Sequence, residues 1–109
     1  MFAAIFPGQG SQSVGMMKDL YKSSNRIRDL YKVASSALDY DLWELTVSDS
    51  SSKLNDTVYT QPAMLVAGVA SWESYNSRFN LLPEYMAGHS LGEYSALVCS
   101  GVINFTDAL

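Results

Sequence analysis

The segment Tyr85-Met86-Ala87-Gly88-His89-Ser90-Leu91-Gly92-Glu93 decides how this chain folds. Tyr85 to His89 is an apolar run typical of a strand, and Leu91 to Ser100 follows at once with the composition of a helix. Ser90 therefore stands between two glycines at a predicted strand-to-helix junction. In such a turn the serine side chain projects into solvent, and the helix behind it directs its positive end at developing negative charge. The spacing predicts a nucleophilic serine.

Ser90 and Glu93 also match a simpler pattern, in which a serine is followed three residues later by a glutamate. In this capping box the serine side chain caps the helix and the glutamate reaches back to the serine N–H. The two interpretations are compatible, and both stay open. His89 is the only histidine, and it is expected to point away from Ser90 because successive strand side chains alternate. We therefore predict packing or a structural hydrogen bond for its ring, not the role of base.

A second glycine-rich turn, Pro7-Gly8-Gln9-Gly10, follows the apolar run Phe2 to Phe6. A short apolar run closed by turn residues is typical of a buried parallel strand that leads into a loop. Two interpretations of the loop remain. It is either a flexible turn, or it presents the backbone N–H of Gln9 to an anion beside Ser90, as a second oxyanion donor.

Helical spacing of apolar residues predicts one or two surface helices over 16–38, with a possible break at Ser23-Ser24-Asn25. Asp41 and Glu44 repeat the capping-box spacing and predict the start of a short helix. A loop is expected over the serine cluster 48–52.

A long, centrally packed helix is expected to begin at Thr60-Gln61-Pro62, because proline is tolerated in the first helical turn. Thr106-Asp107 has the pattern of another helix start, with a hydroxyl cap and then an acid, yet it lies near the end of the sequence. Two parallel strands make a sheet too small to be covered on both faces. The chain is therefore expected to be the front part of something larger.

Composition narrows the classes of function. The 109 residues are 48% hydrophobic and 17% charged, which fits one globular domain or part of one. With Lys+Arg 7 against Asp+Glu 11, the chain lacks the positive excess that nucleic-acid binding needs. One cysteine, Cys99, and one histidine cannot form an internal disulfide or a zinc site. No uncharged run reaches the ~18 apolar residues of a spanning helix, so a cytoplasmic protein without metal or membrane segment is expected.

Three patterns that could bind other ligands are incomplete or ambiguous. Gly10 and Gly15 have the spacing of a phosphate-binding loop, but Met16 and Met17 stand where lysine and a hydroxyl residue should follow. The third glycine of a dinucleotide fingerprint would fall at Ser13. A basic segment could dock an acidic partner, although a solvated helix face is the commoner cause. Its members are Lys18, Lys22, Arg26, Arg28 and Lys32.

Three motifs taken together resemble one enzyme family. They are Phe-Pro-Gly-Gln-Gly-Ser-Gln at 6–12, Thr-Gln-Pro-Ala at 60–63 and Gly-His-Ser-Leu-Gly-Glu-Tyr at 88–94. In order and spacing they resemble the malonyl-CoA:acyl carrier protein transacylases of fatty acid synthesis and the related acyltransferase domains of polyketide synthases. The resemblance spans essentially the whole chain, but only the first third of a family member.

The resemblance implies an α/β fold in which residues 1–109 are an incomplete large subdomain. They would be the front of an α/β-hydrolase-like parallel sheet with a nucleophile elbow, and the ferredoxin-like small subdomain would follow them. Ser90 would carry the malonyl group as an ester from coenzyme A to the phosphopantetheine thiol of acyl carrier protein. The N–H groups of Gln9 and Leu91 would form the oxyanion hole, and Gln61 would line the acyl site. The motif structure would rest on Gly8, Gly10, Gly88, His89 and Gly92.

The resemblance implies no cofactor, since the coenzyme A thioester is the substrate, and Leu91 favours malonyl over methylmalonyl. The family's general-base histidine and its carboxylate-binding arginine would lie beyond Leu109, so the chain alone is expected to be nearly inactive. Two alternatives stay open. One is a serine esterase or lipase, in which water accepts the acyl group. The other is a non-catalytic interaction module in which the turn only caps a helix, so that no acyl donor would label Ser90.

Overall fold

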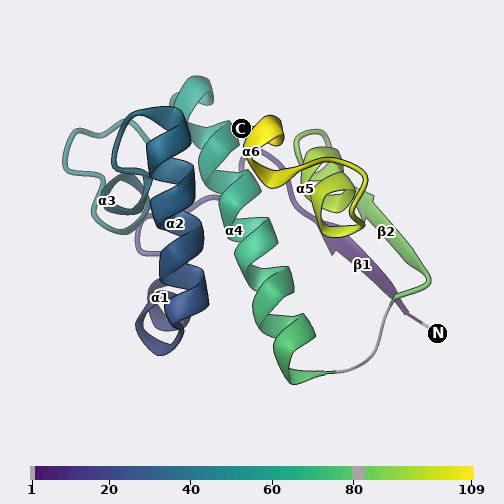
Figure 1. Ribbon diagram of the computed structural model, residues 1–109. Coiled ribbons are helices and arrows are strands. Elements are labelled where there is room, and N and C mark those ends of the chain that lie inside the picture. The colour runs from purple at the N-terminus through teal and green to yellow at the C-terminus, as the bar shows by residue number, and fades with distance from the viewer. Residues whose placement is uncertain (1, 80–82) are drawn as a thin grey trace.

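A computed structural model describes residues 2–79 and 83–109 of the chain as a mixed α/β fold (Figure 1). The elements are, in order, β1 (Ala3–Phe6), α1 (Lys18–Ser23), α2 (Asn25–Leu38), α3 (Leu42–Val47), α4 (Thr57–Arg78), β2 (Tyr85–Gly88), α5 (Gly92–Cys99) and α6 (Phe105–Ala108). Both predicted strands and the predicted order of helices are confirmed. The prediction that the first strand is buried is wrong, because Phe6 is the one buried residue of its four.

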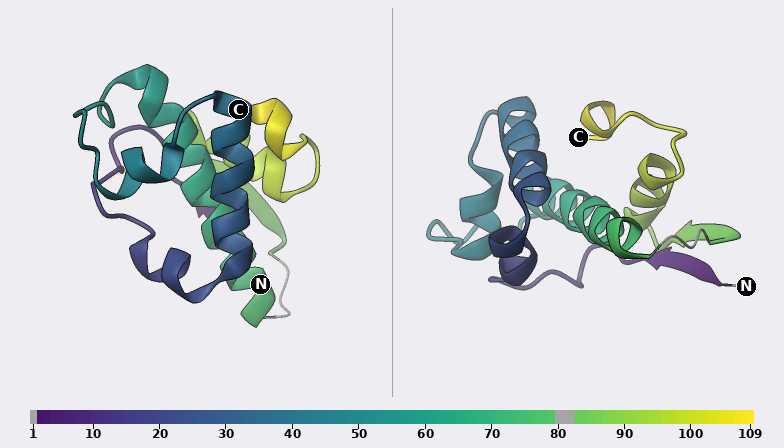
Figure 2. Two further views of the ribbon diagram at one scale, coloured as in Figure 1. Left: turned by 60° about the vertical axis from the view of Figure 1, so that its left-hand side comes forward. Right: turned by 60° about the horizontal axis from the view of Figure 1, so that its bottom comes forward.

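The two strands pair in parallel, with Ala3 opposite Tyr85 and Phe6 opposite Gly88. Because parallel strands run the same way, the loop after β1 and the turn after β2 leave the sheet at the same edge. Figure 2 shows α4 and α5 on the same side of the strands, where Phe6 is buried. On the other face Ile5 is 76% exposed and Tyr85 68%, which makes that face an apolar surface.

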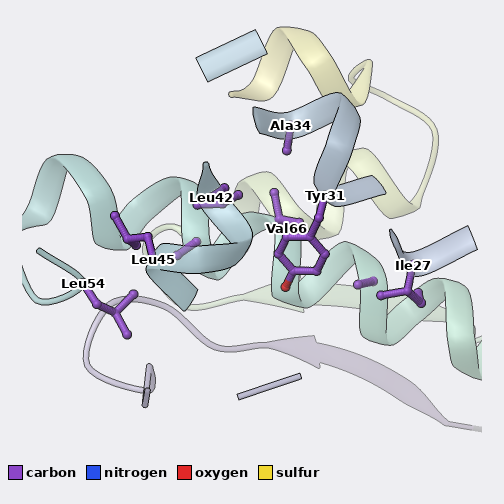
Figure 3. Packing of buried hydrophobic residues seen from close by; sticks show 9 residues of the cluster. Ile27, Tyr31, Ala34, Leu42, Leu45, Leu54 and Val66 are labelled. Carbon is purple, nitrogen blue, oxygen red and sulfur yellow. The ribbon is translucent and has the colours of Figure 1, made fainter. Parts of the chain in front are cut away.

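The hydrophobic core lies between α2, α3 and α4, beside the sheet (Figure 3). From α2, the side chain of Tyr31 extends toward Val66 of α4 and is 1% exposed. The buried cluster comprises Ile27, Tyr31, Ala34, Leu42, Leu45, Leu54, Ala63, Val66 and Ala70. The middle of α4 is buried along most of its circumference, so the prediction of a centrally packed helix is confirmed.

Helix α4 begins at Thr57, earlier than the predicted start at Thr60. The hydroxyl of Thr60 donates to the carbonyl of Asp56 at 2.9 Å and also to that of Leu54, which closes the first turn ahead of the proline. Pro62 therefore lies inside the helix, where its missing N–H leaves the Val58 carbonyl without its usual partner. The helix tolerates this because Val58 is 71% exposed, on the side that faces solvent.

The capping predictions are confirmed in part. The expected break falls at Ser24, whose side chain accepts from the N–H of Ile27 at the start of α2. At α3 the carboxylate of Asp41 accepts from the N–H of Glu44 at 3.0 Å, as predicted. The reciprocal half of that box is wrong, because the Glu44 carboxylate accepts from Ser50 instead. At α6, Asn104 is the cap and not Thr106, since its side chain accepts from the Thr106 N–H at 3.1 Å.

Candidate functional site

The turn between β2 and α5 holds Ser90 in a strained conformation. Its φ is +56°, in the left-handed region, which for a residue other than glycine costs about 1–2 kcal/mol. The backbone around it fixes this geometry. The N–H of His89 donates to Phe6 at 3.1 Å, that of Gly92 to His89 at 3.0 Å and that of Glu93 to Ser90 at 3.0 Å. Strain of this kind persists where the surroundings enforce it, as they often do at functional sites.

Glycines of both motifs let four backbone segments meet. A methyl group on Gly88 would lie 1.9 Å from the carbonyl carbon of Gly92, and one on Gly92 would lie 2.0 Å from the carbonyl oxygen of Phe6. One on Gly8 would lie 2.4 Å from the carbonyl oxygen of His89. Gly10 is required by its φ of +108° and not by crowding. The spacing of the glycines therefore reflects close contact between β1, β2, α5 and the loop after β1.

The hydroxyl of Ser90 is exposed and does not cap the following helix. Leu91 occupies the N-cap position of α5, and no side-chain hydrogen bond caps the helix. The predicted capping box between Ser90 and Glu93 is therefore wrong, since these two residues are joined only through their backbones. A capping serine normally has extended backbone angles, whereas Ser90 has a left-handed φ. Ser90 Oγ therefore accepts no hydrogen bond from the N–H groups at the start of α5.

The loop after β1 brings Gln9 to the same turn. The N–H of Ser11 donates to the carbonyl of Gly8 at 3.3 Å, which forms a tight turn around Gln9. Gly8 is buried against the Ser90 turn, and a methyl group on it would lie 3.5 Å from the backbone nitrogen of Leu91. Among the hydrogen bonds found for residues 2–79 and 83–109, none is donated by the N–H of Gln9 or of Leu91. The N–H of Leu91, which follows Ser90, and the N–H of Gln9, which follows the contact at Gly8, thus have no acceptor among the described residues.

Gln61 and Leu91 line the same hollow, which has a volume of about 390 Å³. It lies between the first turns of α4, the start of α5 and the end of α6, and its walls also include Leu65 and Tyr94. The structure therefore brings together the predicted acyl-lining residue and the residue that follows Ser90. Sequence reasoning did not single out Tyr94 as part of this wall, although it belongs to the quoted motif.

His89 contributes through its backbone and not through its ring. Its carbonyl accepts from Gly92 and touches Gly8, whereas its side chain is exposed and makes no hydrogen bond within the described part of the chain. Within the described residues the ring has neither the packing nor the structural hydrogen bond that the sequence predicted. In the basic segment, Arg26 pairs with Glu73 at 2.7 Å and Arg28 donates to the carbonyls of Tyr21 and Lys22, so both arginines serve the fold.

Burial raises the pKa of several side chains outside the turn at Ser90. Burial raises the pKa of the Cys99 thiol to about 12, so this half-buried cysteine is a poor nucleophile. Burial also raises the pKa of Tyr31 well above its usual value.

Over the ranges that the structure describes, no His, Cys, Asp and Glu side chains gather in a group that could hold a metal. No helix there has the length and hydrophobicity to cross a membrane.

These raised pKa values predict alkaline destabilisation. Above pH ~10 the unfolded chain releases the Tyr31 proton and the folded chain retains it, so the free energy of unfolding falls as the pH rises. The slope for this single group approaches about 1.4 kcal/mol per pH unit. Urea unfolding between pH 8 and pH 11 measures it, with Tyr31→Phe as the variant and Tyr85→Phe, which changes an exposed ring, as the control. Equal slopes for both variants would contradict the prediction.

Three comparisons place this geometry among known proteins. The family model described as the acyl transferase domain matches residues 3–109. A malonyl CoA-acyl carrier protein transacylase of Salmonella typhimurium is 53% identical over 108 residues, which are 99% of this chain and 35% of the relative. The structure of an acyl carrier protein S-malonyltransferase from Vibrio cholerae superposes with a TM-score of 0.94 at 50% identity, covering 98% of this chain and 35% of that one.

A further solved structure contains a malonyl-transacylase in complex with its type II polyketide synthase acyl carrier protein. It superposes with a TM-score of 0.92 at 50% identity, covering 98% of this chain and 35% of that chain. The present chain thus spans about a third of the length of the relatives that it matches.

Proposed function

Because the chain belongs to the acyl transferase domain family, we propose that it forms the nucleophile-bearing part of a malonyl-CoA:acyl carrier protein transacylase. The observation that carries the proposal is the turn at Ser90, where an exposed, uncapped serine is held at a φ of +56°. The start of a helix does not require a strained residue, whereas backbone strain of this kind is concentrated at functional sites. Malonyl-CoA and acyl carrier protein are the substrates that the relatives' names suggest.

The chemistry proceeds in two half-reactions at one serine. Ser90 Oγ attacks the thioester carbonyl carbon, a C–O bond forms, and the C–S bond breaks to release coenzyme A. The phosphopantetheine thiol of the carrier protein then attacks the seryl ester, and Ser90 regains its hydroxyl. In both half-reactions negative charge gathers on the carbonyl oxygen. The N–H groups of Gln9 and Leu91 are the donors that we assign to this oxyanion.

The proton of Ser90 needs a base, and the structure argues against His89 in that role. Its ring is exposed and makes no hydrogen bond to Ser90 among the described residues. A nucleophilic serine and its base normally lie within hydrogen-bonding reach of each other. The proposal therefore assigns the base to the part of the relatives' length that this chain does not span.

The proposal extends to the fold and to the acyl site. The sheet β1–β2 with α5 would be the front of an α/β-hydrolase-like sheet, with Ser90 at its nucleophile elbow and residues 1–109 as the incomplete large subdomain. The hollow beside Leu91 would accept the acyl chain, with Gln61 in its wall. Its wall combines apolar side chains such as Leu65 and Leu91 with the amide of Gln61, which supplies a polar contact for the short malonyl group.

A hybrid protein tests the function directly. It joins residues 3–109 to the part of the Vibrio cholerae relative that the chain does not cover, and the intact relative is the control. With malonyl-CoA, mass spectrometry should show a malonyl adduct on Ser90, and added acyl carrier protein should remove it and gain the same mass. Loss of the adduct to water without transfer would indicate a hydrolase. A folded hybrid that forms no adduct would indicate a non-catalytic module.

A further inference from the structure

The side chain of Gln9 is tied to the first residue of α4. Its amide nitrogen Nε2 donates to Thr57 Oγ1 at 2.9 Å, across 48 positions of sequence. A second bond runs alongside, from Gln12 Nε2 to Asn55 Oδ1 at 2.9 Å. Gln12 Oε1 in turn accepts from the N–H of Gly10 at 2.7 Å. The loop that bears Gln9 is therefore clamped at two points to the segment 55–57.

The segment to which the loop is clamped is itself anchored in the core. Leu54 is 1% exposed, and its N–H donates to Asp49 Oδ2 at 3.1 Å. Thr60 is fully buried, and its hydroxyl donates to the carbonyls of Leu54 and Asp56. The backbone of residues 54–56 is thus anchored on both sides. The exposed side chains of Asn55 and Thr57 extend from this anchored segment and meet the loop.

The clamp restrains the backbone on either side of the Gln9 N–H, which is the group that we assign to the oxyanion. On one side of Gln9, Gly8 rests against the turn that contains Ser90. The side chain of Gln9 itself joins the loop to α4 through its bond to Thr57. The N–H of Gln9 lies between these two fixed points and has no acceptor among the described residues. A donor can stabilise a transition state only if it is already in place, because reorientation during the reaction reduces its contribution.

We infer that Thr57 is a positioning residue, whose hydroxyl holds the side chain of Gln9 so that the Gln9 N–H stays beside that of Leu91. This inference rests on the proposed function of Ser90. Thr57 lies one helical turn before Gln61, so the start of α4 both positions the oxyanion donor and lines the acyl hollow. Thr57 itself does not touch the reacting atoms.

Kinetics of the hybrid protein test the inference. Thr57→Val keeps the shape of the side chain and removes the acceptor, and Gln9→Met removes the donor while keeping the backbone N–H. Each should lower kcat about tenfold and leave KM for malonyl-CoA unchanged, because a bond that acts on the oxyanion alone affects the transition state and not substrate binding. The double variant should be no slower than either single variant. Thr57→Ser, which keeps the hydroxyl, should retain at least half of the activity.

Other outcomes separate this inference from the proposed function. If the unsubstituted hybrid forms no adduct, the proposed function fails, and the clamp is then tested by amide hydrogen exchange. Thr57→Val should speed exchange at Gly10 and Ser11 several-fold, whereas Thr57→Ser should not. The inference is overturned if the hybrid is active and Thr57→Val stays within twofold of it, if the two single variants multiply in the double variant, or if exchange is unchanged.

Discussion

Ser90→Ala reduces malonyl transfer by the hybrid protein by a factor of about 10⁴ to 10⁶, the range seen when a serine nucleophile is removed from a hydrolase. No malonyl adduct forms, because alanine has no oxygen to attack the thioester. Binding of malonyl-CoA stays within a few-fold, since the hollow beside Leu91 and the N–H groups of Gln9 and Leu91 are unchanged. Single-turnover mass spectrometry measures the adduct, and steady-state kinetics measure the transfer.

Ser90→Gly separates the loss of chemistry from any change in stability. Glycine adopts a φ of +56° without the penalty that other residues carry, so this variant is expected to be more stable than the unsubstituted protein by about 1 kcal/mol. It should be as inactive as Ser90→Ala. Greater stability with complete loss of transfer would show that the strain at Ser90 is kept for its hydroxyl.

The opposite result would remove Ser90 from the mechanism. If Ser90→Ala retains transfer within tenfold, or if the malonyl adduct maps to another residue, the turn is structural and the proposed function fails at its centre. Ser100→Ala is a suitable control, because Ser100 is an exposed serine at the far end of α5. Its hydroxyl donates to the carbonyl of Leu97 at 3.0 Å, within the last turn of the helix. It should leave the adduct and the transfer rate unchanged.

Local patterns predicted the elements around the site well. Short apolar runs closed by glycine gave both strands, and the spacing of Gly88 and Gly92 anticipated a close crossing of strand and helix. These features depend on neighbours in sequence, which is why periodicity and turn residues reveal them. The break at Ser24 and the cap at Asp41 follow the same logic.

The sequence was misleading where two local rules compete. Ser90 and Glu93 satisfy the capping-box spacing, but the strand–helix crossing imposes a left-handed φ at Ser90 and so moves the cap to Leu91. At α4 the proline rule placed the start at Thr60, whereas the helix begins at Thr57 and the N–H of Thr60 already donates to the carbonyl of Asp56 at 2.8 Å. At Ser90 a tertiary contact outweighs the local preference, and at α4 another local contact does.

The clamp between Gln9 and Thr57 could not be predicted from sequence at all. Nothing in the motif of either residue indicates the other, and 48 positions separate them. Their contact follows from the way α4 crosses the carboxyl edge of the sheet, which is a property of the whole fold. The same holds for the meeting of Gln61 with Leu91, which the resemblance to a family implied but no spacing could show.

Gly92→Ala should unfold the chain or lower its free energy of unfolding by more than about 3 kcal/mol. The added methyl group would lie 2.0 Å from the carbonyl oxygen of Phe6 and 2.8 Å from its carbonyl carbon. These are backbone atoms of a strand that is hydrogen bonded to β2, so they cannot move aside as the end of a side chain could. Relief of the clash requires α5 to separate from β1, which would also dismantle the turn at Ser90.

Gly68→Ala is the matched control, because it adds the same methyl group to a helix that crosses the same region. Its nearest neighbours would be Ser95 Oγ at 3.1 Å, Ser95 Cβ at 3.3 Å and the Phe6 ring at 3.4 Å, all side-chain atoms, and a shift of a few tenths of an ångström relieves these contacts. Alanine is also favoured over glycine inside a helix by about 1 kcal/mol, so Gly68→Ala should be nearly neutral. Urea unfolding followed by circular dichroism compares the two. If Gly92→Ala is as stable as Gly68→Ala, α5 does not pack on β1 at backbone contact, and the crossing that strains Ser90 does not exist in solution.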